Sequence, residues 1–305
     1  MVVELYDVRS VRGEFVASPT DGWGWFLSNS GWIIGDDATL VIDTAVSERR
    51  TAWLERSIAE HRRARGVSGP VSVALTHVHG DHANGAYLFE ARGATVFASP
   101  GTSHEAGLGI QRFPGFLSET PWGDVRMPSA IHAVRAERTL DLGGVRATLR
   151  PCPRVAHTAG DLTVSSSGGV LWAGDLAWNG VTPLAVQGSV EGWLSTLDEL
   201  AAEGHQDVVP GHGPVGGPEL FARTRDYLDW VQDVAATAVR DCTTAESALT
   251  RQPRSDRPWR EWPCLERDVG NVMRSMAEQR DQPFELLAAI TAMLKVHGGP
   301  VRAPS

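Results

Sequence analysis

The chain has 305 residues, of which 42% are hydrophobic and 21% are charged. This length suits one large domain or two small ones, and the composition is ordinary for a globular protein. No apolar run reaches the roughly 18 residues that indicate a membrane-spanning helix. The formal net charge is -9 and the sequence contains no basic stripe. Both features argue against a protein that binds nucleic acid.

The cysteines and the N-terminal sequence bear on where the protein resides. The three cysteines are Cys152, Cys242 and Cys264, and none belongs to a Cys-x-x-Cys pair. An odd, scattered set favours a reducing compartment over a disulfide framework. Residues 1–7 lack the basic segment and apolar run of a secretion signal, and they predict a first strand instead. We therefore expect a cytoplasmic protein that does not bind membranes.

The N-terminal part of the chain predicts short strands followed by alternating helices and strands. Turn residues separate the β-prone runs, and the first helix has Ser47 as its N-cap and Gly66 as its stop. A compact apolar run ends directly at His77 and predicts a buried strand. The predicted elements are strands at 23–28, 31–34 and 38–43, a helix at 47–65, a strand at 71–75, a helix at 83–91 and a strand at 95–98.

The segment from Gly101 to Pro128 breaks this pattern, because glycines and prolines are mixed with large apolar side chains. A long apolar loop in a compact domain is often a lid or a binding loop. Strands resume between Thr139 and Asp175, with hairpin turns at 143–144 and 168–169. The rest of the chain predicts a helix at 189–203, a strand at 207–210, an amphipathic helix at 218–241, a polar linker at 251–260, and helices at 265–280 and 283–296.

A dense group of metal-binding residue types follows the strand at 71–75. The sequence His77-Val-His79-Gly-Asp81-His82 places three imidazoles and a carboxylate within six residues. Residues at i and i+2 of an extended segment project to the same side, so His77 and His79 point together. Asp81 and His82 start the next helix and face the same place from another direction. Imidazole and carboxylate groups suit zinc, so the sequence predicts a zinc site here.

Three more candidate ligands lie downstream, each in a turn or at the end of a predicted strand: His157, Asp175 and His212. Neighbouring glycines allow sharp turns that bring a ligand close to the first group. Taken one at a time, each of the three is as readily a structural residue as a ligand. Together with the first group they suffice for two metal ions with open positions for water. The remaining histidines are isolated, as surface or core histidines usually are: His61, His104, His132, His205 and His297.

These residues resemble the metallo-β-lactamase superfamily over about residues 15–215. Its H-x-H-x-D-H motif stands here as the segment from His77 to His82, and the three downstream candidates follow in the family's order. The resemblance implies an α+β fold, a four-layer αββα sandwich with the site at one edge between two sheets. We accordingly expect a catalytic domain over residues 1–241 and a helical C-terminal extension over residues 242–305 that packs on it.

The resemblance also implies how two zinc ions would be held. It divides the ligands into two groups bridged by Asp175: His77, His79 and His157 for one ion, and Asp81, His82 and His212 for the other. Iron or manganese could take the same places, because histidine and aspartate serve all three metals. Asp43 matches the family's first-motif aspartate, which usually supports the ligands from behind; a plain turn residue is the alternative. An aspartate at 175 resembles the thioesterase, lactonase and nuclease branches, whereas the lactamase branch has a cysteine ligand.

A finer resemblance follows Asp175 in the sequence. Four segments are similar to the second-ring cyclases of bacterial aromatic polyketide pathways, the actinorhodin type: Ala173–Pro183, Gly188–Val190, Pro210–Pro218 and Arg225–Val231. This resemblance implies an enzyme that closes a ring on a carrier-bound polyketide and releases the product as a thioesterase. The partner would be a small-molecule polyketide or one bound to an acyl carrier protein, and a homodimer is compatible with this interpretation.

Both reactions develop negative charge on a substrate oxygen, so one two-metal site can serve either. In this hypothesis Asp81 is the catalytic residue that orients water. Five aromatic side chains are candidates for an apolar substrate pocket, with plain core packing as the alternative: Trp25, Phe113, Phe116, Trp122 and Trp178. Other functions remain open. The first alternative is another hydrolase on the same fold, such as a glyoxalase-type thioesterase, a lactonase or a β-lactamase. The second is a nuclease, which the acidic net charge disfavours. The third is a non-catalytic metal-binding or redox module.

Overall fold

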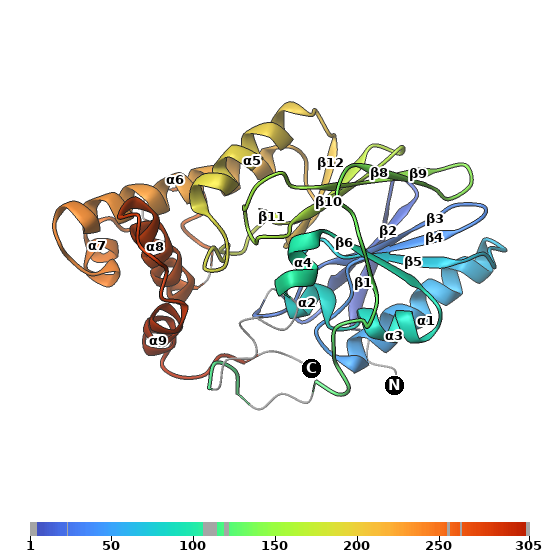
Figure 1. Cartoon of the computed structure of the whole chain (residues 1–305), viewed down its shortest axis with the longest axis horizontal. Coiled ribbons are helices and arrows are strands. Elements are labelled where there is room, and N and C mark those ends of the chain that lie inside the picture. The colour runs from blue at the N-terminus through green and yellow to red at the C-terminus, as the bar shows by residue number, and fades with distance from the viewer. Residues whose placement is uncertain are drawn as a thin grey trace.

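The structure is a computed structural model that describes residues 5–22, 24–105, 115–118, 122–254, 257–262 and 264–302, without the side chains of 103–105. Two mixed β-sheets face each other in this part of the chain (Figure 1). The larger sheet runs β1-β2-β3-β4-β5-β6-β7: Tyr6–Val11, Glu14–Pro19, Ser30–Ile34, Thr39–Ile42, Val71–Ala74, Thr95–Ala98 and Ile131–Ala133. The smaller sheet runs β12-β11-β10-β9-β8: Asp207–His212, Val170–Trp178, Leu162–Ser166, Arg146–Pro151 and Arg138–Asp141.

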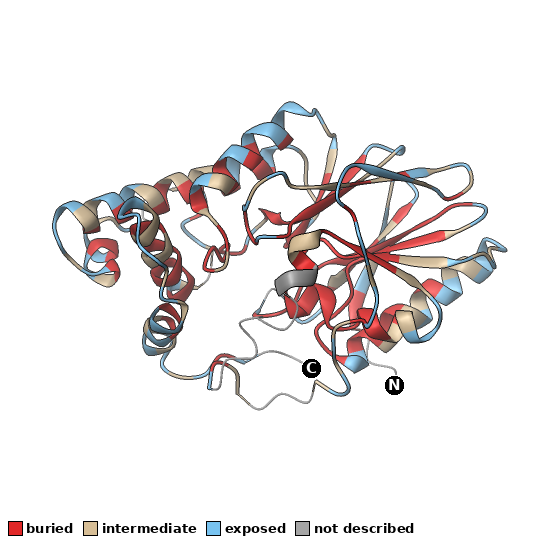
Figure 2. Ribbon diagram, in the orientation of Figure 1, coloured by how far each residue is buried: buried red, intermediate tan, exposed pale blue. Residues whose placement is uncertain are grey.

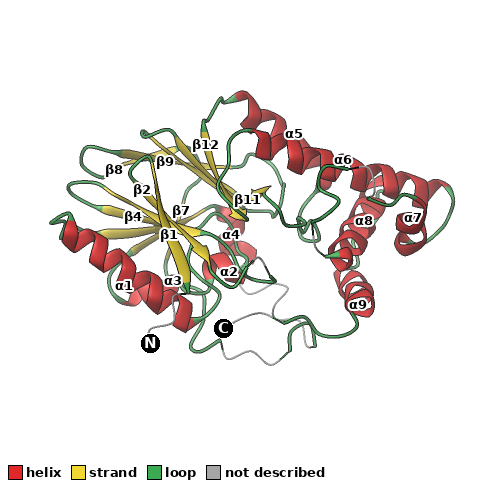
Figure 3. Ribbon diagram, turned by 180° about the vertical axis from the view of Figure 1, so that it is seen from behind, coloured by secondary structure: helices red, strands yellow, loops and turns green. Residues whose placement is uncertain are grey.

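Helices cover the outer face of each sheet. The helices α1 (Glu48–Ala64) and α3 (Ala86–Ala91) lie on the larger sheet, and α5 (Val190–Ala202) and α6 (Glu219–Arg240) lie on the smaller one (Figures 1 and 3). The side chain of Ser47 accepts a hydrogen bond from the backbone N–H of Arg50 and so caps α1, as predicted. The layers follow the order helix, sheet, sheet, helix, which confirms the αββα sandwich.

A central strand has helices on one face and the other sheet on the opposite face, so its sequence is a continuous apolar run. In β4, Leu40 and Ile42 pack between the two sheets, whereas Val41 packs toward α1. Successive side chains of a strand point to opposite faces, which is why one strand contributes to two cores. The buried residues accordingly follow the two sheets through the centre of the molecule (Figure 2).

The C-terminal helices are α7 (Ala245–Arg251), α8 (Leu265–Gln279) and α9 (Leu286–His297). They lie at the end of α6 that points away from the sheets, where α7 and α8 pack against it (Figure 1). Side chains of α7 and α8 share one apolar cluster with α5 and α6, and α9 belongs to a second cluster with Phe26 and Phe116. The backbone of Val301 pairs with the loop at Phe116 and Ser118. The predicted boundary after residue 241 remains a prediction. No helix of the described residues is long and apolar enough to cross a membrane.

Several predicted elements differ from the observed ones. The strand predicted at 23–28 is wrong, because the described residues 24–29 form no strand, and Phe26 has a φ of 60° that an extended chain does not allow. The helix predicted at 83–91 is instead two short helices, α2 (Gly80–Ala83) and α3, separated by Asn84 and Gly85. The helix α4 (Pro100–Glu105) and the seven-residue helix α7 lie where the sequence predicted no helix.

Candidate metal centre

The seven predicted ligands meet at one edge of the sandwich, between the two sheets. They sit directly after β5, on α2, in the loop between β9 and β10, within β11 and at the end of β12. All are buried, and they form two groups in which the possible ligand atoms lie within 4.8 Å of one another. The groups are His77, His79, His157 and Asp175, and Asp81, His82 and His212.

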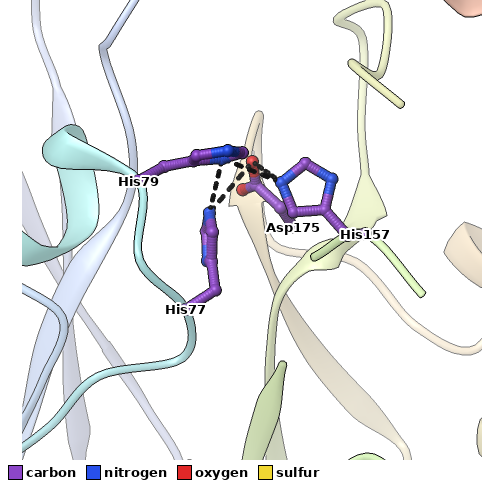
Figure 4. A group of neighbouring side chains, drawn as sticks. All are labelled: His77, His79, His157 and Asp175. Carbon is purple, nitrogen blue, oxygen red and sulfur yellow. Dashed lines mark hydrogen bonds and ion pairs between the residues drawn. The ribbon is translucent and has the colours of Figure 1, made fainter. Parts of the chain in front are cut away.

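The first group converges on one point (Figure 4). The Nε2 atoms of His77 and His157 each lie 3.0 Å from Nδ1 of His79. The Oδ2 atom of Asp175 lies 3.3 Å from Nε2 of His157 and 3.7 Å from Nε2 of His77. Ligand atoms around one tetrahedral zinc ion are about 3.3 Å apart when each metal–nitrogen bond is about 2.05 Å. The four side chains therefore have the spacing of a single ligand set.

The second group lies on the other side of Asp175. The Oδ2 atom of Asp81 is 3.2 Å from Nε2 of His212 and 3.7 Å from Nε2 of His82. The Oδ1 atom of Asp175 is 3.2 Å from Nε2 of His82 and 3.5 Å from Nε2 of His212. Each carboxylate oxygen of Asp175 thus faces a different group. A side chain at residue 211 would prevent this, since a Cβ on Gly211 would lie 1.8 Å from Asp175 Oδ1.

Hydrogen bonds behind the histidines fix which ring nitrogen carries the proton. His79 Nε2 is 2.8 Å from the amide oxygen of Gln187, and His212 Nδ1 is 2.8 Å from the carbonyl oxygen of Leu27. His82 Nδ1 is 2.8 Å from a carboxylate oxygen of Asp43. Because these oxygens only accept, each ring must donate outward. In the neutral form of each ring, the nitrogen that faces the centre therefore has a lone pair to offer a metal.

Asp43 organises both groups from behind. Its Oδ1 accepts from the backbone N–H of Thr76, and its Oδ2 accepts from the Thr76 hydroxyl and from His82. Since the Thr76 hydroxyl donates to Asp43, its oxygen accepts from His77 Nδ1 at 3.0 Å. One buried carboxylate thus sets the orientation of a ligand in each group. This arrangement agrees with the supporting role that the resemblance implied for Asp43.

The centre fits two metal ions rather than a hydrogen-bonded cluster. Lone pairs of His77 and His79 face each other at 3.0 Å without a proton between them, an arrangement that a cation makes favourable. Among the described residues, the buried atoms His82 Nε2 and Asp175 Oδ1 lie 3.2 Å apart and make no regular hydrogen bond to other groups. Buried polar atoms rarely lack a partner unless an ion or water supplies one. Histidine and aspartate suit zinc, iron and manganese, so the donor set does not select the element.

The two groups should bind metal with different pH dependence. Burial, reinforced by neighbouring imidazoles, lowers the pKa of His77 well below 6.5 and that of His79 to about 4. Burial also lowers the pKa of His82, but nearby carboxylates, chiefly Asp175 and Asp81, raise it by more, so that it ends well above 6.5. Burial lowers the pKa of His212 as well, but Asp175 and Asp81 raise it by more. In metal-free protein His77 and His79 therefore lose their protons at lower pH than His82 and His212, whose protons a metal must displace.

We expect calorimetric zinc titrations between pH 6 and pH 8 to distinguish zinc binding by the first group from zinc binding by the second group. The zinc equivalent held by the second group should gain more affinity as the pH rises, and release more protons on binding, than the equivalent held by the first group. Buffers of different ionisation enthalpy measure the proton release directly. Equal pH dependence for both equivalents would contradict the assignment of protons to the second group.

A narrow cavity opens onto the metal ligands. It is lined by Trp25, Phe26, His79, Asp81, Asp175, Trp178, Leu184, His212 and Arg267. The predicted residues Trp25 and Trp178 lie on its wall, and the Trp178 ring stacks on His212 with centroids 4.2 Å apart. Phe116 and Trp122 instead pack into the adjoining aromatic cluster, around Phe26. Phe113, also predicted, lies outside the described residues.

Several residues of this site have no signal in the sequence. Gln187 and Thr76 orient ligand histidines, and Phe26, Leu184 and Arg267 line the cavity. None belongs to a local motif with ligand spacing, and Arg267 comes from α8, far along the chain from the other lining residues. Their roles depend on how distant segments pack, which the sequence pattern alone does not reveal.

Comparisons with known proteins agree with this geometry. The family model described as the metallo-beta-lactamase superfamily matches residues 23–212. A metallo-beta-lactamase type 2 from Bacteroides fragilis is 24% identical over 218 residues, which covers 68% of this chain and 78% of the relative. Among solved structures, a metallo-beta-lactamase from Erythrobacter litoralis has a TM-score of 0.58 at 18% identity, covering 75% of this chain and 98% of its own.

A second solved structure, a metallo-beta-lactamase from Pontibacter korlensis, has a TM-score of 0.53 at 20% identity and covers 73% of this chain and 93% of its own. At these identities the structural likeness concerns the fold. The family model spans more than half of the chain and includes every predicted metal ligand, from His77 to His212. The chain therefore belongs to the metallo-beta-lactamase superfamily.

Proposed function

We propose that this protein is a two-metal cyclase and thioesterase that acts on a carrier-bound aromatic polyketide. The observation that supports this most is Asp175, whose two oxygens face two separate ligand groups beside a cavity with indole walls. A carboxylate in this position suits a centre that acts on a carbonyl group with two metals. The finer substrate assignment rests on the resemblance of Ala173–Pro183 and Pro210–Pro218 to second-ring cyclases.

The chemistry follows from the groups that surround the cavity. Metal ions held by the two groups would lower the pKa of water and polarise a carbonyl. Burial raises the pKa of Asp81, but His82 and His212 lower it by more, so this carboxylate is ionised and can accept a proton. Trp25, Trp178 and Leu184 keep the wall apolar, which excludes bulk water and strengthens the electrostatic interactions inside.

Two reactions are then possible in one cavity. In thioester hydrolysis, a carbon–oxygen bond forms from water, the carbon–sulfur bond breaks, and a proton passes to the departing thiolate. In ring closure, Asp81 accepts a proton from carbon between two carbonyls, and that carbon attacks a ketone of the same chain. This forms a carbon–carbon bond, and the resulting alkoxide takes up the proton that Asp81 accepted. The same carbon then loses its second proton and the hydroxyl leaves as water, which forms a carbon–carbon double bond. Both reactions place negative charge on oxygen at the same point, which is the charge that the centre stabilises.

Hydrolysis of β-lactams is a second candidate, favoured by the relative from Bacteroides fragilis. The group attacked in a β-lactam is also a carbonyl, so the same metal centre could catalyse its hydrolysis. The aspartate at residue 175 instead resembles the thioesterase and lactonase branches. A substrate comparison separates these functions, because the leaving groups differ while the attacked carbonyl is common.

Chelation and a substrate panel test the proposal. We expect removal of metal to lower turnover of an aromatic β-ketoacyl thioester more than about 100-fold, since water then loses its activation, and zinc to restore it. The panel compares that thioester with S-lactoylglutathione and a cephalosporin under the same conditions. Unchanged turnover after chelation would refute the metal mechanism. Rapid cleavage of the cephalosporin or of S-lactoylglutathione, with no action on the polyketide thioester, would refute the substrate assignment.

A further inference from the structure

Arg267 is a buried arginine on the wall of the catalytic cavity. It lies in the first turn of α8, and only 2% of its surface is exposed. It lines the same cavity as Asp81, Asp175 and His212. The family model ends at residue 212, so this side chain comes from a segment outside the matched residues. The helical extension therefore adds a positive charge to the site.

The guanidinium group of Arg267 has unused hydrogen-bond donors. Its Nη1 donates to the carbonyl oxygen of Thr182 at 2.7 Å. Within the described residues its Nε, although buried, has no hydrogen-bond partner, and no carboxylate lies within ion-pair distance of the group. Two other arginines differ, because buried Arg50 is paired with Asp21 and half-buried Arg254 with Asp268. Arg267 is thus a buried cation without a counter-ion.

Two indole rings hold this cation in place. The guanidinium carbon of Arg267 lies 4.2 Å from the ring centroid of Trp25 and 5.4 Å from that of Trp178. Cation–π contacts of this kind offset part of the cost of removing the charge from water. Trp178 also stacks on the predicted ligand His212. The rings therefore connect the position of the guanidinium group to that of the metal centre.

A buried charge without a partner is unfavourable, so its retention calls for a ligand that supplies the missing charge. Because Nη1 is engaged by Thr182, the donors of Nε and Nη2 remain, and they lie on one edge of the planar group. Such an edge matches the two oxygens of a planar oxyanion through two parallel hydrogen bonds. Arg267 would repel a metal cation, whereas both Arg267 and metal ions bound at the neighbouring centre would attract an anion.

We propose that Arg267 binds a planar oxyanion of the substrate, of which a carboxylate is the simplest. The substrate class is then a carbonyl compound with a separate anionic group, which lies at Arg267 while the carbonyl faces the metal ligands. This inference rests on the proposed function for the reaction of the carbonyl, and binding of the anion is independent of it. Arg267 acts as a residue that determines specificity.

Calorimetric binding of benzoate and its neutral isostere benzamide tests this inference without turnover. The full-length protein, zinc-loaded and metal-free, is compared with Arg267→Met at constant ionic strength. Loss of two charge-assisted hydrogen bonds should weaken benzoate binding about 10–100-fold in both forms and leave benzamide binding unchanged. Arg267→Lys keeps the charge but not the planar edge, so it should restore part of the affinity. Phenyl phosphate, a tetrahedral anion, should bind parent and Arg267→Met with a smaller difference than benzoate.

Arg50→Met provides the matched control. Arg50 is a buried arginine that also lies over an aromatic ring, Tyr6, but it is paired with Asp21. Its replacement should lower the unfolding temperature and leave benzoate affinity unchanged. Arg267→Met should instead keep or raise the unfolding temperature, because it removes an uncompensated charge. An unchanged preference for benzoate over benzamide in Arg267→Met would overturn the proposal, whether or not the protein turns over any thioester.

Discussion

Replacing Asp175 with asparagine should leave the protein with at most one tightly bound metal ion and lower turnover by about 10³-fold or more. The amide nitrogen of asparagine cannot ligate, so one of the two groups loses its shared oxygen. A loss of about 4 kcal/mol in transition-state stabilisation corresponds to this factor. Elemental analysis of the purified variant and steady-state kinetics on the best substrate of the panel measure both effects.

Asp268→Asn is the control for the general cost of neutralising a buried aspartate. Asp268 is buried on α8, where it pairs with Arg254 and accepts from the hydroxyl of Tyr227. Its replacement should lower stability while the metal content stays at two ions per chain. If Asp175→Asn retained two ions and parental turnover, the bridging role of Asp175 would be wrong.

Replacing Asp43 with asparagine should weaken metal binding about 10–100-fold, a range typical for partners of ligand histidines, with the larger effect on the group that contains His82. The variant loses the anion that accepts from His82 and from the hydroxyl and backbone N–H of Thr76. Asp43 has a φ of 56°, a left-handed conformation that asparagine tolerates well. Zinc competition with a chromophoric chelator measures the affinity change without a strained backbone.

The same variant should show a pH-dependent loss of stability in the metal-free state. Burial lowers the pKa of His82, but the surrounding carboxylates, including Asp43, raise it well above 6.5. The stability that charged His82 gains is therefore complete below the unfolded pKa of about 6.5 and is lost as pH rises through the folded pKa. Urea unfolding should show a larger destabilisation by Asp43→Asn at pH 6 than at pH 9. A larger destabilisation at pH 9 would contradict this charge interaction.

The sequence identified candidate metal ligands because their chemistry is local. The cluster from His77 to His82 needs only a buried strand and one turn to bring its side chains together, and both leave a clear pattern. The three later ligands lie at strand ends or in turns, and the order of a known family places them. The structure brings all of them to one edge of the sandwich.

The surroundings of the centre were less predictable because they depend on distant contacts. The run at 23–28 has the apolar pattern of a strand, yet Trp25 and Phe26 line the cavity, and the positive φ of Phe26 breaks the extended conformation. The break at Gly85 also has a tertiary cause, since a Cβ there would lie 2.0 Å from the hydroxyl of Thr51 on α1. No local pattern records such a contact. The place of Arg267 in the cavity wall could not be predicted from the sequence for the same reason.

The division of ligands between the two sheets affects the stability of the protein and its resistance to proteolysis. Each group takes side chains from both halves of the sandwich, so each bound ion ties the halves together as a cross-link. An ion at 100 times its dissociation constant adds about 2.7 kcal/mol to the free energy of unfolding. A shortage of metal would then expose the chain to proteases before substrate becomes limiting. We therefore expect the supply of metal in the cell to affect the abundance of this protein as well as its activity.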